Sequence, residues 1–239
     1  MKTQQLYLLD SYAKEMAATI LEVVPEGEKR FRVMLDSTVF YPMGGGQPTD
    51  QGMLTSDSWS GNVYQVMTKD GEIWHYVESE AAPTVGVKVH GVLNWDRRFR
   101  HMRLHSAGHM VDFAMYLLGY SPKQLVPTKG DHGKKPYIIY MGVLGKDIAN
   151  ELEEKSNELV AQSLTLSVSL GTLEEITKDA IYLQPGLPIN KQLRKLTLEG
   201  VGSVADGGTQ VERTREIGKI TIPSVVEENG QTIVSYQIS

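Results

Sequence analysis

The stretch that decides the fold is NWDRRFRHMRLHSAGHMVDFAMYLLG, residues 94–119. Its apolar residues recur at the spacing of one helix face, at Ala107, Met110, Val111, Ala114, Leu117 and Leu118. We expect Asp96 to be the N-cap of this helix, and Gly119 and Pro122 to end it. The pattern therefore predicts one long helix between two segments of different character.

Upstream of this helix, short segments rich in Val, Tyr, Trp and Phe predict β structure. Turn signals separate them, and the pair Asp70-Gly71 is typical of a hairpin turn. The predicted strands include residues 31–35, 62–68, 73–77 and 85–93. Several short strands at this spacing, with no helix among them, favour a small barrel or sandwich.

Downstream of the helix, helices and strands are interspersed. Helices are expected over residues 147–161 and from Thr172, where Thr-x-x-Glu with Glu175 forms a capping box. Strands are expected at 137–143, 164–170 and 196–199, and in a C-terminal pair around Asn229-Gly230. The predicted fold class is α+β, with a small β-barrel domain over residues 1–92 and an α+β domain over residues 93–239.

The composition excludes several classes of protein. The 239 residues contain no cysteine, which excludes disulfides, thiol catalysis and thiolate metal ligands. The sequence has no run of about 18 apolar residues and no apolar secretory stretch near its start, so we expect a soluble, cytoplasmic protein with no membrane partner. Its 24 basic and 29 acidic residues give a net charge of −5. That charge disfavours a protein that wraps nucleic acid but allows a local basic patch.

Three histidines follow one another at spacings of four on the predicted helix: His101, His105 and His109. This spacing puts their rings near one face, opposite the apolar stripe, with neighbouring rings close enough to share a metal ion. Two good ligands are the most that a helix pair supplies, so the others must come from elsewhere in the chain. The alternative is a set of partly exposed histidines beside four arginines.

Two glycine-rich segments are also candidates for carrying chemistry. Residues 41–52 read YPMGGGQPTDQG, and their three consecutive glycines allow either a tight barrel corner or the close approach of a ligand. In the second case Gln47 would point its amide at a substrate. The glycine spacing matches neither a Walker A loop nor a dinucleotide-binding fingerprint. Residues 204–211 read VADGGTQV, where a glycine pair lets Asp206 and Gln210 face one site, the alternative being an ordinary loop.

In this order, the three segments resemble the editing domain of alanyl-tRNA synthetase and its free-standing relatives, the AlaX proteins. Residues 95–109 resemble the approach to the family's His-x-x-x-His motif, and residues 40–52 its glycine-rich motif. Residues 206–211, with 214–222 behind them, match the region of the second metal motif. The resemblance covers nearly the whole chain and is strongest to the medium-length AlaX class. It implies an N-terminal β-barrel and an α+β editing core, similar to the second additional domain of threonyl- and alanyl-tRNA synthetases.

One departure from the family concerns the metal. The family's second motif is Cys-x-x-x-His, and here those positions hold Asp206 and Gln210. The resemblance implies a zinc site formed by His105, His109, Asp206 and Gln210, with a carboxylate in place of a thiolate and a weak amide ligand in place of a histidine. Two outcomes stay open. Either the two histidines and Asp206 hold zinc with a weakly filled fourth position, or the site is metal-free and Asp206 or Gln210 bonds the histidines directly.

The resemblance implies an aminoacyl-tRNA deacylase. Its reaction would hydrolyse the ester that joins a wrong amino acid, serine or glycine, to the 3′ end of tRNA(Ala). Editing is needed because a pocket for alanine rejects similarly small amino acids only weakly by binding. The candidate catalytic residues are His105, His109, Asp206, Thr209 and Gln47. Among these Thr209 and Gln47, together with residues 126–128, are candidates for binding the serine hydroxyl, and without a metal Asp206 is the leading general base.

Two basic clusters are candidates for holding the tRNA acceptor end. The arginines proposed as tRNA-binding are Arg97, Arg98, Arg100 and Arg103 before the histidines, and Arg194, Arg213 and Arg215 near the third segment. Solvated faces are the alternative for both clusters. Two other functions also stay open: a non-catalytic tRNA- or protein-binding module that kept the fold, and a metal-dependent hydrolase of small esters or amides.

Overall fold

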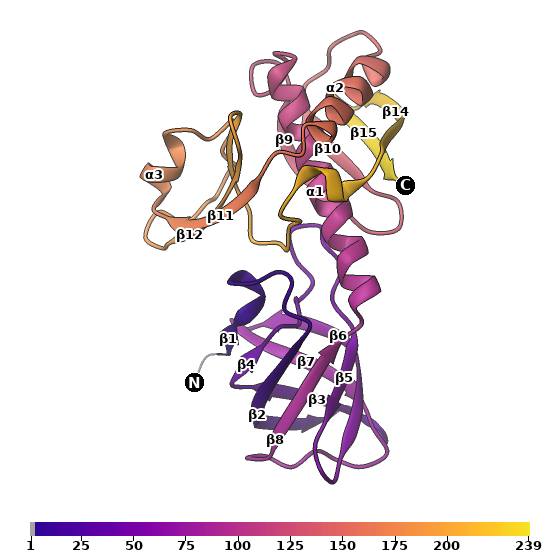
Figure 1. Ribbon diagram of the computed structural model, residues 1–239, viewed down its shortest axis with the longest axis vertical. Helices are drawn as coiled ribbons and strands as arrows, with labels where there is room; N and C mark the ends of the chain where they lie inside the picture. The colour runs from indigo at the N-terminus through magenta and orange to yellow at the C-terminus, as the bar shows by residue number, and fades with distance from the viewer. Residues whose placement is uncertain (1–2) are drawn as a thin grey trace. The chain divides into compact units, whose positions relative to one another are not determined.

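The computed structural model describes residues 3–239 and divides the chain into two compact units, with the boundary between His101 and Met102. Helix α1 (Trp95–Leu117) begins in the first unit and continues in the second (Figure 1). Within the described residues, no helix is both long enough and apolar enough to cross a membrane. The predicted α+β fold with a small N-terminal barrel is confirmed.

The first unit is a closed antiparallel barrel in the strand order β2-β3-β7-β6-β5-β8 (Figure 1). Its strands are β2 (Glu15–Pro25), β3 (Arg30–Leu35), β5 (Gly52–Thr55), β6 (Ser60–Lys69), β7 (Glu72–Glu78) and β8 (Lys88–Leu93). A short parallel pair, β1 (Gln4–Gln5) with β4 (Ser37–Thr38), and a 3-10 turn, η1 (Leu6–Leu8), complete the unit.

Alternation along the strands fills the barrel. In β8, Val89, Gly91 and Leu93 are buried while the residues between them are exposed, which is the period of two expected of a strand with one face on a core. The predicted hairpin at Asp70-Gly71 is confirmed, since both residues have positive φ, 54° and 80°, between β6 and β7. Such a turn matches the twist of the strands that it joins.

The glycine-rich segment forms a tight turn within the first unit. Gly44 and Gln47 exchange backbone hydrogen bonds, and Gly45 and Gly46 between them have φ of 54° and 80°. Only glycine adopts such angles at no steric cost, which explains the run of glycines. Gln47 is fully buried in this turn. The geometry is therefore that of a tight corner.

A buried ion pair anchors the end of this segment. Arg98, which has no exposed surface, donates from Nε to Asp50 Oδ2 at 2.8 Å and from Nη2 to the Val39 carbonyl at 2.5 Å. The same Asp50 oxygen accepts the Tyr41 backbone N–H at 2.7 Å. Arg98 also donates to the Ser11 carbonyl at 3.0 Å, so one guanidinium binds two backbone carbonyls and the Asp50 side chain, from three separate stretches of the chain.

The second unit contains two further sheets. A four-stranded antiparallel sheet has the order β14-β15-β10-β9, and a three-stranded one the order β11-β12-β13. The strands are β9 (Val126–Asp131), β10 (Tyr137–Met141), β11 (Leu166–Gly171), β12 (Leu193–Leu198), β13 (Gly202–Ala205), β14 (Ile220–Glu228) and β15 (Gln231–Ile238). The helices are α2 (Ala149–Ala161), α3 (Leu173–Thr177) and a 3-10 turn, η2 (Thr214–Ile217). Helix α2 packs against β14.

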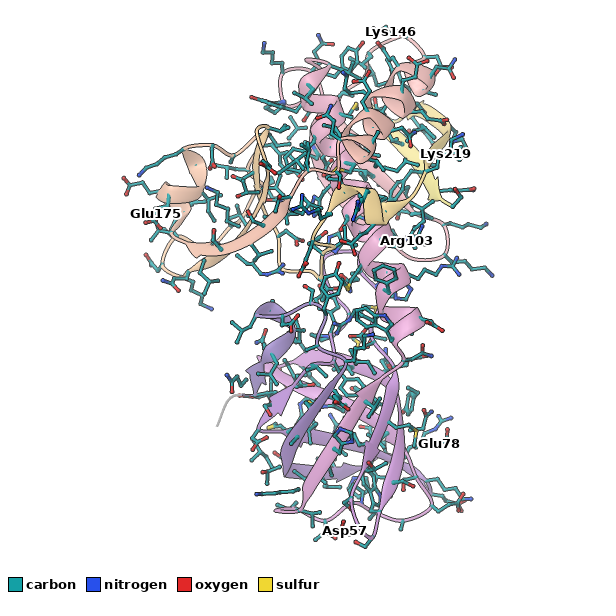
Figure 2. All side chains as sticks on the ribbon, in the orientation of Figure 1. Asp57, Glu78, Arg103, Lys146, Glu175 and Lys219 are labelled. Atoms are coloured by element: carbon teal, nitrogen blue, oxygen red, sulfur yellow. The ribbon has the colours of Figure 1, made fainter. Side chains whose placement is uncertain are left out.

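The helix ends test the predicted caps. The Asn94 side chain accepts the Arg97 N–H at 3.1 Å, so Asn94 caps α1, and the prediction of Asp96 is wrong by two residues. The capping box of Thr172 and Glu175 is confirmed, although the helix that follows it has only five residues. Figure 2 labels Glu175, the third residue of that short helix.

We expect Arg98→Ala to lower the free energy of unfolding of the first unit by about 3–5 kcal/mol, because Asp50 would stay buried without its cation. The three tryptophans, Trp59, Trp74 and Trp95, all lie in this unit, so urea unfolding followed by tryptophan fluorescence measures it selectively. The exposed pair of Lys29 and Glu80 provides the control, and Lys29→Ala should cost less than about 1 kcal/mol. Equal losses in the two variants would contradict the role of Arg98.

A second prediction concerns His75, whose ring is buried in the barrel between the Val33 carbonyl and the Thr38 hydroxyl. Burial lowers the pKa of His75 from 6.5 to about 4. The unfolded chain therefore binds a proton between these values that the folded chain does not, and stability falls as the pH drops from 6.5 to 4. The loss should approach 3 kcal/mol, at ~1.4 kcal/mol per unit of pKa. In the same fluorescence assay, the free energy of unfolding should fall less steeply with falling pH for His75→Gln than for the wild type. Equal slopes in the two proteins would refute the prediction.

Candidate metal centre

Three side chains from two separate segments of the second unit meet at one point. Helix α1 supplies His105 and His109, and the loop after β13 supplies Asp206. Asp206 Oδ1 lies 3.2 Å from His105 Nε2 and 3.5 Å from His109 Nε2. One ligand atom from each residue lies within 4.8 Å of the other two, the arrangement required to hold a metal ion.

The histidines of α1 are buried. His105 and His109 are at most 6% exposed, and their rings stack with centroids 5.0 Å apart. The alternative of partly exposed histidines is therefore wrong. The helix is packed on nearly all sides through this part of the unit, because residues 104–115 are buried without a break. His101 is also buried but belongs to the first unit.

The carboxylate of Asp206 is held by donors on its other oxygen. Asp206 Oδ2 accepts from the Gly208 backbone N–H at 3.1 Å and from Gln210 Nε2 at 2.9 Å, and Arg194 Nη1 lies 3.4 Å away. Burial alone would raise the pKa of Asp206, but the charges and hydrogen bonds of the two histidines hold it well below its usual value. The group is therefore an anion whose Oδ1 faces the imidazoles.

Gln210 supports this carboxylate from behind. Its Oε1 accepts from the Ser106 hydroxyl at 2.6 Å while its Nε2 donates to Asp206. Ser106 in turn accepts the Val211 backbone N–H at 3.1 Å, so both ends of the Gln210 amide are engaged beside the site. Of the four residues predicted as ligands, the structure brings His105, His109 and Asp206 together and places Gln210 beside them, bonded to Asp206.

The chemistry of these three residues fits a divalent cation. Imidazole nitrogen and carboxylate oxygen are both normal zinc ligands, and three protein ligands with an open position are typical of catalytic zinc. His109 Nε2 is buried 3.5 Å from Asp206 Oδ1, a contact too long to satisfy the nitrogen fully, and a cation held between the two groups would satisfy both. Burial lowers the pKa of His109, but Asp112 and Asp206 outweigh burial and raise it to about 9. A bound cation would therefore replace a proton at this ring.

Sequence reasoning missed two side chains next to the site. His132 stacks on His105 with centroids 4.3 Å apart, and its Nδ1 lies 2.5 Å from the Tyr236 hydroxyl. Asp112 lies 3.5 Å from His109 Nδ1. For Asp112 a signal existed in the sequence, since it follows His109 by three positions on the same helix. For His132 there was none, because nothing in its own segment places it against α1.

The remaining candidate catalytic residue of this unit, Thr209, is fully buried in the same loop as Asp206. The predicted arginines differ in exposure. Arg100, Arg213 and Arg215 are exposed, and Arg97 donates to the Thr49 carbonyl.

Three further predicted arginines bind backbone carbonyls or buried carboxylates. Arg103, labelled in Figure 2, donates to the Ile217 carbonyl at 3.0 Å. Arg194 is buried and donates to the Gly208 carbonyl. Arg98 is buried on Asp50, as described above. Because Arg98 and Arg194 present no guanidinium at the surface, we leave both out of the arginines available to RNA.

Comparison with known proteins identifies relatives along most of the chain. The family model for class II tRNA synthetases (A) matches residues 10–97. The alanyl-tRNA editing protein AlaX-M of Methanosarcina barkeri is 35% identical over 229 residues, 92% of each chain. That of Saccharolobus solfataricus is 34% identical over 245 residues, 99% of each chain. An alanine–tRNA ligase of Halobacterium salinarum is 32% identical over 228 residues, but these span only 24% of that enzyme.

The close contact between Gly108 of α1 and the His132 ring leads to a prediction. A Cβ atom at Gly108 would lie 2.7 Å from His132 Cε1, so Gly108→Ala should destabilise the protein by about 1–3 kcal/mol, although alanine favours helix. Thermal or urea unfolding followed by far-UV circular dichroism measures the loss. Adding His132→Ala should recover much of it, because the clash disappears. At Gly207 a Cβ would meet nothing within 4 Å, so Gly207→Ala is the matched control. No coupling between the Gly108 and His132 changes would refute the packing argument.

Proposed function

Because this chain belongs to the AlaX-M family of alanyl-tRNA editing proteins, we propose that it is a deacylase of mischarged tRNA(Ala). The reaction would hydrolyse the ester between a wrong amino acid and the 3′ end of the tRNA, with serine preferred and glycine the second candidate. The observation that carries the proposal is the convergence of His105, His109 and Asp206 in a buried site. In domain terms, we assign the glycine-motif barrel to residues 1–92 and the deacylase core to residues 93–239.

In this proposal His105, His109 and Asp206 would hold a zinc ion. Zinc would supply a Lewis acid for the ester carbonyl or for the attacking water. The chain's own contribution is to keep the three ligands in place with little exposure, 2–8% of each side chain, which strengthens the charge interactions among them. Gln210 and the Gly208 N–H keep the Asp206 carboxylate ionised and turned toward the imidazoles.

The metal-free alternative gives Asp206 the role of general base. The contact of 3.2 Å between Asp206 and His105 is compatible with a direct hydrogen bond. However, the donors on Asp206 Oδ2 stabilise the carboxylate and make it a weak base. We therefore favour Asp206 as a metal ligand.

Recognition of the substrate would combine two sets of groups. We propose Arg100, Arg213 and Arg215 as the arginines that contact tRNA phosphates, since their side chains are exposed. Thr209 is the candidate for bonding the serine hydroxyl, because it follows Asp206 by three positions in the same loop. An acceptor for that hydroxyl would be left unpaired by alanine, which would spare correctly charged tRNA. Gln47 is not proposed for this role, because it is fully buried in the glycine-rich turn of the first unit.

The test is deacylation of Ser-tRNA(Ala) carrying labelled serine. The wild-type protein should release serine well above background and spare Ala-tRNA(Ala), and His105→Ala and Asp206→Ala should each lower kcat/KM at least about 100-fold. His90→Ala, which removes an exposed histidine of the first unit, should leave kcat/KM unchanged.

The other outcomes identify the rival functions. Binding of Ser-tRNA(Ala) without turnover would support a non-catalytic module, and equal hydrolysis of a small ester without any tRNA would support a small-molecule hydrolase. If chelator-treated protein that contains no metal keeps full deacylation activity, the proposed role of zinc is wrong and the proposed deacylase activity stands.

A further inference from the structure

A second buried carboxylate lies on the far side of His109 from Asp206. Asp112 follows His109 by one helical turn in α1 and is 5% exposed. Its Oδ2 lies 3.5 Å from His109 Nδ1, whereas Asp206 faces the opposite ring nitrogen, Nε2. One imidazole therefore lies between two acids, with only its Nε2 side turned to the ligands described above.

Two tyrosines hold Asp112 in place. Tyr140, from β10, donates its hydroxyl to Oδ1 at 2.7 Å, and Tyr182, from the segment between α3 and β12, donates to Oδ2 at 3.0 Å. All three side chains are buried. Burial, with Asp112 next to it, raises the pKa of each tyrosine well above its ordinary value, so both hydroxyls keep the protons that they donate. The carboxylate is thus oriented by parts of the chain that do not supply a ligand.

Resting on the proposed function, we infer that Asp112, held by Tyr140 and Tyr182, is a positioning residue that fixes His109 for metal binding. Within the described residues, His109 Nδ1 is buried and has no hydrogen-bond partner, and Asp112 is the acid that faces it. With the Nδ1 proton directed at Asp112, the Nε2 lone pair is directed at the metal. A carboxylate behind a ligating histidine sets the tautomer and ring orientation and makes the ligand more basic.

Asp112 acts on one of the two histidines, because its Oδ2 faces His109 Nδ1. His105 stacks on His132. In this proposal the protein controls the orientation of His109 through the charge of Asp112. Burying the Asp112 carboxylate costs desolvation free energy, which two tyrosine hydroxyls offset only in part. A cation or a polarised N–H must offset the rest, and the His109 ring is the group that faces Asp112.

The experiment measures zinc affinity by competition with a chromogenic chelator, together with the ¹⁵N and ¹H signals of the His109 ring in zinc-loaded, histidine-labelled protein. Asp112→Ala should weaken zinc binding about 10–100-fold and lose the protected Nδ1 proton. Tyr140→Phe and Tyr182→Phe should each weaken it by a smaller factor, and neither should weaken it further in the Asp112→Ala background. Tyr236→Phe, which removes an equally buried hydroxyl on His132, is the matched control and should change zinc affinity less than about twofold.

Unchanged zinc affinity and an unchanged His109 ring signal in Asp112→Ala would overturn the inference, as would a wild-type protein that binds no zinc. If Asp112→Ala does not fold, Asp112→Asn and the two tyrosine variants answer the same question, because they keep the packing and alter the charge or its orientation. If the variants change zinc affinity as expected but the wild-type protein does not deacylate Ser-tRNA(Ala), the proposed function is wrong and the role of Asp112 stands. If the wild-type protein deacylates Ser-tRNA(Ala) but the variants leave zinc affinity unchanged, the role of Asp112 is wrong and the proposed function stands.

Discussion

The second unit depends on keeping the carboxylate of Asp206 ionised although its side chain is only 7% exposed. Asp206 would lose more by burial than it gains unless every lone pair finds a donor or a cation. The loop after β13 meets that requirement with a backbone N–H, an amide and a guanidinium on one oxygen, and with two imidazoles facing the other. Because those partners come from α1, from β12 and from the loop itself, satisfying one charge fixes the relative positions of all three.

The first unit also buries a charged group among partners that satisfy it, and here the central group is a cation surrounded by acceptors. Arg98 brings a cation into the end of the barrel, where Asp50 and two carbonyls receive it. Lysine could not replace Arg98 here, because a planar guanidinium donates to several acceptors at once and a single ammonium group does not do so in the same geometry. Sequence reasoning had given this arginine to RNA because it lies in a basic run, and it had no means of knowing that its partner lies in the glycine-rich segment.

Local patterns were enough to predict the fold class, the hairpin at Asp70-Gly71 and the capping box at Thr172, because each depends on residues close together in the chain. The family motif also led to the three residues that meet at the site. The partners that each site residue finds in distant parts of the sequence could not be predicted. His132 and Asp206, which lie against the helix histidines, come from distant parts of the chain, and so do the hydroxyls of Tyr140 and Tyr182 on Asp112. The family motif made Gln210 a candidate ligand, and its bond to Ser106 could not be predicted because the two residues are 104 positions apart.

A carboxylate at position 206, where the motif that this segment resembles has a cysteine, also changes which oxidation reactions the site is open to. A cysteine ligand is open to peroxide and to disulfide exchange once its metal leaves, and its sulfur can pass irreversibly to higher acids. Asp206 has no such sulfur chemistry, and the chain holds no cysteine elsewhere. A period without metal would therefore expose no thiolate to oxidants at this site.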